Sequence, residues 1–90
     1  MKDKVVLQLK GYPTSYGGVD EFITFDGQHL YYVATGRDDF GNIINDKIPL
    51  KYDAKSRMFY VDDDYFQISL DVIPTKIVET LKRNGIINDV

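Results

Sequence analysis

Alternating apolar and polar positions predict strands over much of this 90-residue chain. Near its start, Val5, Leu7 and Leu9 recur at every second position, and this period of two places them on one face of a strand. A glycine-rich stretch with one proline follows, and such stretches break strands. The pattern therefore predicts a strand over residues 5–10 and a surface loop over residues 11–18.

Residues 21–35 carry the strongest hairpin signal in the sequence. The dipeptide Asp26-Gly27 lies between two runs of aromatic and β-branched residues, and it favours the tight turns that join antiparallel strands. Whether the loop holds two or four residues, the main apolar side chains of both strands share one face. These side chains are Ile23, Phe25, Leu30, Tyr32 and Ala34.

A polar connection over residues 36–46 follows the hairpin. It carries three large apolar residues, Phe40, Ile43 and Ile44, among polar and charged neighbours. Because burial of large apolar side chains stabilises a small domain, we expect these three residues to pack back onto the core.

A three-stranded meander is predicted over residues 47–72. With a turn at Ala54-Lys55, antiparallel pairing opposes Ile48 with Val61, Leu50 with Phe59, Tyr52 with Arg57 and, on the other face, Lys47 with Asp62. With the next turn at Asp63-Asp64, the opposed pairs are Val61 with Phe66 and Phe59 with Ile68. The apolar faces agree across all three strands, and a one-residue slip would destroy that agreement.

The acidic run Asp62-Asp63-Asp64 has two interpretations. Its carboxylates offer the oxygen ligands that calcium and magnesium prefer, but their adjacency does not match the alternating ligands of an EF-hand loop. Asp is also favoured in turns, because its short side chain hydrogen-bonds nearby backbone. We therefore interpret the run as a turn of the meander and predict no metal site there.

The end of the chain changes to a helical period. Ile77, Val78 and Leu81 recur at helical spacing after a proline, and Asn84-Gly85 supplies a stop signal. The predicted fold class is therefore α+β. We expect an antiparallel sheet or curled small barrel of five to six strands with one C-terminal helix over about residues 75–84, forming a single domain over residues 1–90.

Composition and charge exclude several classes of function. The chain has no cysteine, which excludes disulfides, thiolate metal sites and a cysteine nucleophile. Its formal net charge of -3 is spread along the sequence, which argues against nucleic-acid binding through a basic surface. No apolar run approaches the roughly 18 residues of a membrane span. The charged start, without a signal peptide, leads us to expect a cytoplasmic protein.

No catalytic motif accompanies these features, so we predict no catalytic residue, no cofactor and no metal. We expect a small protein-interaction module, such as an adaptor, inhibitor or accessory protein of a bacterium or phage, with an unknown protein partner. Tyrosine is enriched at interfaces, and the predicted contact residues in the two loops are Tyr12, Tyr16, Arg37 and Phe40.

Three alternatives remain open at the level of the sequence. The first is a divalent-cation-dependent enzyme or ligand binder that uses residues 62–64 with His29, the single histidine. The second is an acidic mimic of nucleic acid. The third concerns assembly: the strand over residues 5–10 could pair with a copy of itself to form a homodimer.

Overall fold

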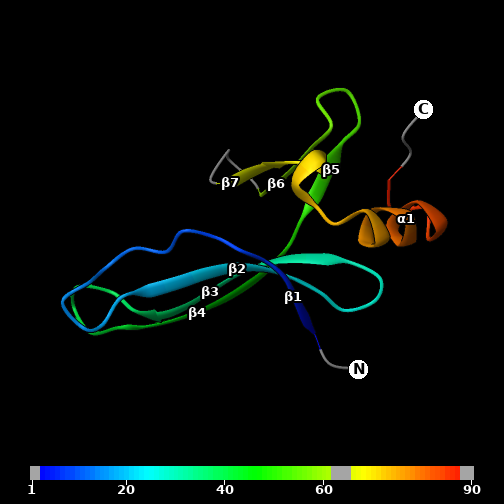
Figure 1. The fold of residues 1–90 in the computed structure, drawn as a ribbon. Coiled ribbons are helices and arrows are strands. Elements are labelled where there is room, and N and C mark those ends of the chain that lie inside the picture. The colour runs from blue at the N-terminus through cyan, green and yellow to red at the C-terminus, as the bar shows by residue number, and fades with distance from the viewer. Residues whose placement is uncertain (1–2, 62–65, 88–90) are drawn as a thin grey trace.

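The protein folds into two antiparallel sheets and one C-terminal helix, as Figure 1 shows for the computed structural model, which describes residues 3–61 and 66–87. The four-stranded sheet has the order β1-β2-β3-β4, with β1 at Lys4–Gln8, β2 at Val19–Phe25, β3 at Leu30–Arg37 and β4 at Ile43–Pro49. The three-stranded sheet has the order β5-β6-β7, with β5 at Lys51–Asp53, β6 at Met58–Val61 and β7 at Phe66–Ser69. A short 3-10 turn at Leu70–Val72 leads to α1 at Thr75–Arg83.

The prediction of one sheet or barrel of five to six strands is wrong, because the chain changes sheets at Leu50. Before this point Ile48 pairs with Tyr32 of β3, and after it Tyr52 pairs with Phe59 of β6. Leu50 donates its N–H to the Leu30 carbonyl at 2.9 Å, and β3 begins at Leu30, so β3 offers no further residue for pairing. The predicted meander strand is therefore divided between the two sheets.

The predicted register of the meander is correct in one half only. The β5 and β6 strands pair two residues away from the predicted register, with Tyr52 rather than Leu50 opposite Phe59. A shift of two leaves every side chain on its predicted face. The pairing of β6 with β7 is confirmed, with Val61 opposite Phe66 and Phe59 opposite Ile68.

Two further predictions about the meander concern the acidic turn and the pairing of Lys47. The turn expected at residues 62–64 lies outside the described residues. Lys47, which was expected to face Asp62, belongs to β4 and pairs with Val33 of the other sheet.

The predicted hairpin is confirmed as β2 and β3. Phe25 pairs with Leu30 and Ile23 pairs with Tyr32, which leaves residues 26–29 as the turn. All four of these apolar side chains are buried in one cluster. The local Asp-Gly signal and the alternating pattern were therefore sufficient to define this element.

The C-terminal helix and its stop are also confirmed. The N–H of Ile86 donates to the Leu81 carbonyl at 2.9 Å, and the N–H of Gly85 donates to the Lys82 carbonyl at 3.1 Å. Gly85 has φ 76°, so these bonds form the Schellman arrangement that ends many helices. Leu81 is fully buried, and this side chain docks the helix on the core.

One core joins both sheets and the helix. Its buried members are Val19, Ile23, Phe25, Leu30, Tyr32, Ala34, Phe59, Val61, Leu70, Ile73, Leu81 and Ile87. Most of those from the first sheet lie toward the β2–β3 turn, and the molecule is elongated, with extents of 45 × 29 × 17 Å. The opposite end of the four-stranded sheet therefore extends beyond the second sheet and the helix (Figure 1).

That extension corrects the prediction for residues 36–46. Instead of a connection folded onto the core, these residues form the end of β3, a short turn and the start of β4. Ile44 packs partly against the core. Phe40 and Ile43 remain 85% and 73% exposed, because Phe40 lies in the turn and Ile43 lies on the sheet face opposite Ile44.

Candidate functional site

The exposed end of the four-stranded sheet brings two loops together. In an antiparallel sheet of order β1-β2-β3-β4, the β1–β2 and β3–β4 connections lie at the same end, and both are visible at the left of Figure 1. We call this end the tip and define it as residues 11–18 together with residues 37–43. It lies opposite the β2–β3 turn.

The β3–β4 turn in the tip is held by the side chain of Asp38. Asp38 Oδ1 accepts hydrogen bonds from the backbone N–H groups of Phe40 at 2.9 Å and Asn42 at 2.8 Å. Partial desolvation raises the pKa of Asp38, but the hydrogen bonds from Asn42 and Phe40 outweigh it and hold the pKa below its ordinary value. The charged carboxylate therefore orders the turn that presents Phe40.

Side-chain hydrogen bonds join the two loops of the tip. Thr14 Oγ1 donates to the Arg37 carbonyl at 2.6 Å, and the backbone N–H of Ser15 donates to Asp39 Oδ1 at 2.9 Å. Arg37 Nη1 donates within its own turn to the Gly41 carbonyl at 3.0 Å. Each loop thus restrains the other through hydrogen bonds.

A glycine makes room for an aromatic ring between the loops. A Cβ atom at Gly41 would lie 3.2 Å from the Tyr16 ring, and Gly41 has a φ of 83°. The ring therefore lies directly over the Gly41 backbone. Tyr16 is still 57% exposed, so one part of the ring packs on the turn and another faces solvent.

The tip contains all four predicted contact residues. Tyr12 and Tyr16 come from the first loop, and Arg37 and Phe40 come from the β3–β4 side. Tyr12 forms an isolated bridge with Val19 and remains partly exposed. Arg37 also stabilises the β3–β4 turn through its hydrogen bond to the Gly41 carbonyl. Their role in binding stays a prediction.

The sequence reasoning missed Ile43 as a surface residue. Ile43 pairs with Arg37 across β3 and β4. This pair lies at the end of the sheet that extends beyond the second sheet and the helix (Figure 1). The signal that could have revealed it is the pairing of residues 30–37 with residues 43–49, which places Ile43 beside the turn rather than over the core.

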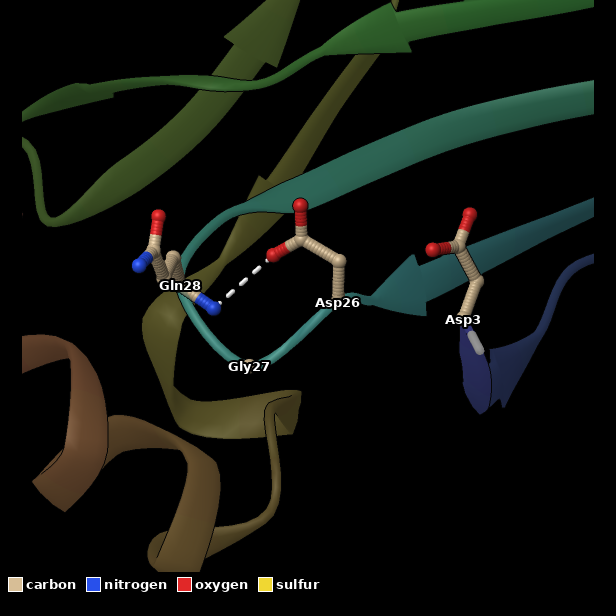
Figure 2. A pocket seen from close by; sticks show the side chains of 4 residues that line it. All are labelled: Asp3, Asp26, Gly27 and Gln28. Atoms are coloured by element: carbon tan, nitrogen blue, oxygen red, sulfur yellow. Dashed lines mark hydrogen bonds between the residues drawn. The ribbon is translucent and has the colours of Figure 1, made fainter. Parts of the chain in front are cut away.

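A hollow of about 380 Å³ lies near the opposite end of the sheet, lined by Asp3, Asp26, Gly27 and Gln28. Figure 2 shows the two carboxylates at its sides. Asp26 Oδ1 accepts the backbone N–H groups of Gln28 and His29, both at 2.8 Å. These bonds, from His29 and then Gln28, lower the pKa of Asp26 below its ordinary value of 3.8.

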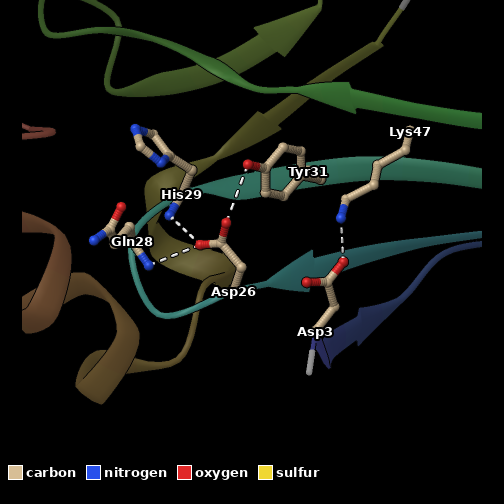
Figure 3. Close-up of polar contacts among 6 residues, drawn as sticks. All are labelled: Asp3, Asp26, Gln28, His29, Tyr31 and Lys47. Carbon is tan, nitrogen blue, oxygen red and sulfur yellow. Dashed lines mark hydrogen bonds and ion pairs between the residues drawn. The ribbon is translucent and has the colours of Figure 1, made fainter. Parts of the chain in front are cut away.

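Neighbouring side chains also contact both carboxylates of this hollow (Figure 3). Tyr31 donates its hydroxyl to Asp26 Oδ2 at 3.1 Å, and this bond raises the pKa of Tyr31. Lys47 pairs with Asp3, which raises the pKa of Lys47, and its Nζ lies 4.5 Å from the centre of the Tyr31 ring. The carboxylates are therefore satisfied by the turn and by an ion pair.

The described residues contain no group of three or more histidine or acidic side chains that could hold a metal ion. His29 contributes its backbone N–H to Asp26, and its ring points away from that carboxylate in Figure 3. The proposed partners of His29 at residues 62–64 lie outside the described residues.

The stability of the β2–β3 turn is expected to depend on pH through Asp26. A carboxyl whose pKa is lowered by folding stabilises the native state above its unfolded pKa, and this contribution is lost as pH falls through the folded pKa. Between pH 5 and pH 2, the wild-type unfolding temperature should therefore fall more steeply than that of Asp26→Asn. Thermal unfolding followed by circular dichroism checks this, and equal slopes would contradict it.

Comparison of the chain with protein-family models, with characterised proteins and with solved structures found no match. In the described part of the chain, no helix has the length and apolar character needed to cross a membrane. The fold and the tip define a small α+β protein with an exposed, hydrogen-bonded loop pair. Inference about function therefore rests on the geometry of that tip.

Proposed function

We propose that this protein is an interaction module that binds a protein partner through its tip. The observation that supports the proposal is the exposure of Phe40, at 85%, on a turn ordered by Asp38. Phe40 and Ile43 add no burial to the core, and their exposure carries a cost in water. A partner surface that covers both side chains would recover that burial.

Two features of the tip favour binding: its exposed aromatic side chains and its ordered loops. Aromatic residues are enriched at protein interfaces, and a few such side chains supply most of the binding energy. A loop already held in one conformation loses less entropy on association than a flexible one. The bonds from Thr14 to Arg37 and from Ser15 to Asp39 supply this order before a partner arrives.

Binding without catalysis is supported by how the tip uses its ionisable groups. Asp38 and Asp39 accept backbone N–H groups, and Arg37 donates to a carbonyl of the same turn. Each group thus has a structural task in shaping the loops. An adaptor or inhibitor needs this kind of fixed apolar surface and no reactive group.

The double variant Phe40→Ser with Ile43→Ser tests the proposal. Truncation of two central interface residues costs roughly 2 kcal/mol or more, so partner capture from lysate of the source organism should fall by about 30-fold or more. The matched control is Val72→Ser, which removes a half-exposed apolar side chain outside the tip.

Both variants change exposed residues, so their stabilities should stay within about 0.5 kcal/mol of wild type. The proposal predicts that a specific partner is lost from the tip variant and retained by Val72→Ser, as measured by quantitative mass spectrometry. Equal capture by the wild type and the tip variant would contradict it.

A further inference from the structure

The outer edge of β4 is a long and regular strand edge. All seven residues from Ile43 to Pro49 pair in continuous register with β3, and among the described strands β4 pairs with β3 alone. The other edge of this sheet, β1, has a register irregularity between Val5 and Leu7. Irregularities of this kind blunt an edge against further pairing, and the β4 pairing has none.

The direction of the β4 backbone groups follows from its neighbours. The N–H of Leu50 donates to the Leu30 carbonyl at 2.9 Å, in register with the β3–β4 pairs. Antiparallel pairs alternate between hydrogen-bonded and non-hydrogen-bonded. Counting back from Leu50, the even-numbered residues of β4 bond to β3, and the N–H and C=O groups of Ile43, Asn45 and Lys47 point outward.

A second bond agrees with this direction. The N–H of Arg37 donates to the Gly18 carbonyl at 3.2 Å, on the β2 side of β3. Arg37 is the residue opposite Ile43. Because the backbone N–H of Arg37 points toward β2, the pair of Arg37 with Ile43 is a non-hydrogen-bonded pair of β3 and β4. The backbone N–H and C=O groups of Ile43 therefore point away from β3.

Side chains on β4 define what an added strand would meet. Ile44 and Ile48 are half-buried on the core face, and exposed Asp46 lies between them on the same face. Asp46 has no ion pair among the described residues, whereas Lys47 on the opposite face is paired with Asp3. An added strand would therefore gain most from apolar residues at both ends and a cation at its centre.

We propose that β4 accepts an extended segment of the partner as a fifth, antiparallel strand. The segment has apolar residues opposite Ile44 and Ile48 and a lysine or arginine opposite Asp46, so backbone bonds supply affinity and side chains supply specificity. This inference rests on the proposed function, because Ile43 belongs both to the tip and to the β4 edge.

A second copy of this chain fits the β4 edge less well. A two-fold axis that pairs the whole strand with itself sets Asp46 against Asp46 of the copy, and like charges directly opposite each other are destabilising. A shift by two residues in either direction sets Asp46 opposite Ile44 or Ile48. Charge and apolar complementarity therefore favour a segment of different sequence.

A synthetic peptide with the central sequence valine-threonine-lysine-threonine-valine, capped at both ends, probes this edge directly. In amide hydrogen-exchange and NMR titrations, the N–H groups of Ile43, Asn45 and Lys47 should become protected on binding. Replacing the peptide lysine with glutamate should weaken binding by about 2- to 10-fold, because it turns an attractive pair with Asp46 into a repulsive one.

The protein variants are Asn45→Pro and its control Asn45→Thr. Proline is tolerated on an edge strand where its missing N–H would face solvent, so Asn45→Pro removes an outward donor and leaves the β3 ladder intact. Peptide binding should fall about tenfold in Asn45→Pro and stay within about twofold in Asn45→Thr. Thermal unfolding verifies that both variants are folded.

The outcomes separate this inference from the proposed function. A peptide that binds wild type and Asn45→Pro equally, or leaves the β4 amides unprotected at millimolar concentration, overturns strand addition. If the Phe40→Ser, Ile43→Ser variant still loses its partner in that case, the tip proposal stands alone. If the peptide protects β4 and the tip variant retains its partner, strand addition stands and the tip proposal fails.

Discussion

Replacing Phe59 with alanine is expected to destabilise the protein by about 3 to 5 kcal/mol. Phe59 is 1% exposed and lies on the central strand of the second sheet, with its ring 4.9 Å from the Tyr52 ring. It belongs to the same buried cluster as Ile23 and Leu30 of the first sheet. Its removal therefore opens a cavity in the core that joins the two sheets.

Such a loss is large for a protein of this length, whose total stability is expected to be about 5 to 13 kcal/mol. Urea unfolding measures it, and Phe40→Ala is the matched control, because the same change at an 85% exposed site should cost no more than about 0.5 kcal/mol. A loss below about 1 kcal/mol for Phe59→Ala would mean that the two sheets do not share one core.

Gly36→Ala is expected to disrupt the base of the tip. A Cβ atom at this position would lie 2.2 Å from the Gly18 carbonyl oxygen and 2.8 Å from the Val19 Cα. Gly36 also has φ 146°, where side chains are disfavoured. Backbone strain alone costs about 1 to 3 kcal/mol, and the clash forces β2 and β3 apart in addition.

Gly17→Ala separates these two effects. Gly17 has φ 103°, but nothing lies within 4 Å of its added Cβ. Urea unfolding should therefore show a clearly larger loss for Gly36→Ala, and hydrogen exchange should show faster opening of the Arg37 N–H, which bonds to Gly18. Equal losses for the two variants would contradict the close approach of these strands.

The parts of the fold that were predictable depend on local signals. The Asp26-Gly27 turn and the alternation around it define the β2–β3 hairpin within 19 residues, from Val19 to Arg37. Gly85 and Ile86 similarly end α1 through bonds to the last turn of the helix. In both cases the deciding interactions lie between residues close in sequence.

The division into two sheets depended on non-local pairing. The sequence predicts one strand over residues 47–52, but the ladder with β3 ends at Leu50, opposite the first residue of β3, and Tyr52 pairs with β6. The start of β4 was hidden because Ile43 and Ile44 are adjacent, so they do not alternate. Only the pairing with β3 places these two isoleucines on opposite faces.

The candidate site was partly predictable for a different reason. The sequence predicts Tyr12, Tyr16 and Phe40 as contact residues because they are aromatic residues in polar loops. The order of the strands in the sheet then brings both loops to one end. Two contacts of the tip could not be predicted from the sequence, because they join residues far apart along the chain. They are the hydrogen bond from Ser15 to Asp39 and the packing of Tyr16 on Gly41.

The most direct measurement of the central claim is site-specific photocrosslinking in lysate of the source organism. Phe40 is replaced by p-benzoylphenylalanine, which keeps an aromatic ring at the tip, and the same residue replaces Val72 in the control. The tip proposal predicts one dominant protein adduct from position 40 and no such adduct from position 72. The absence of an adduct from position 40, or the same adduct from both positions, would contradict binding through the tip.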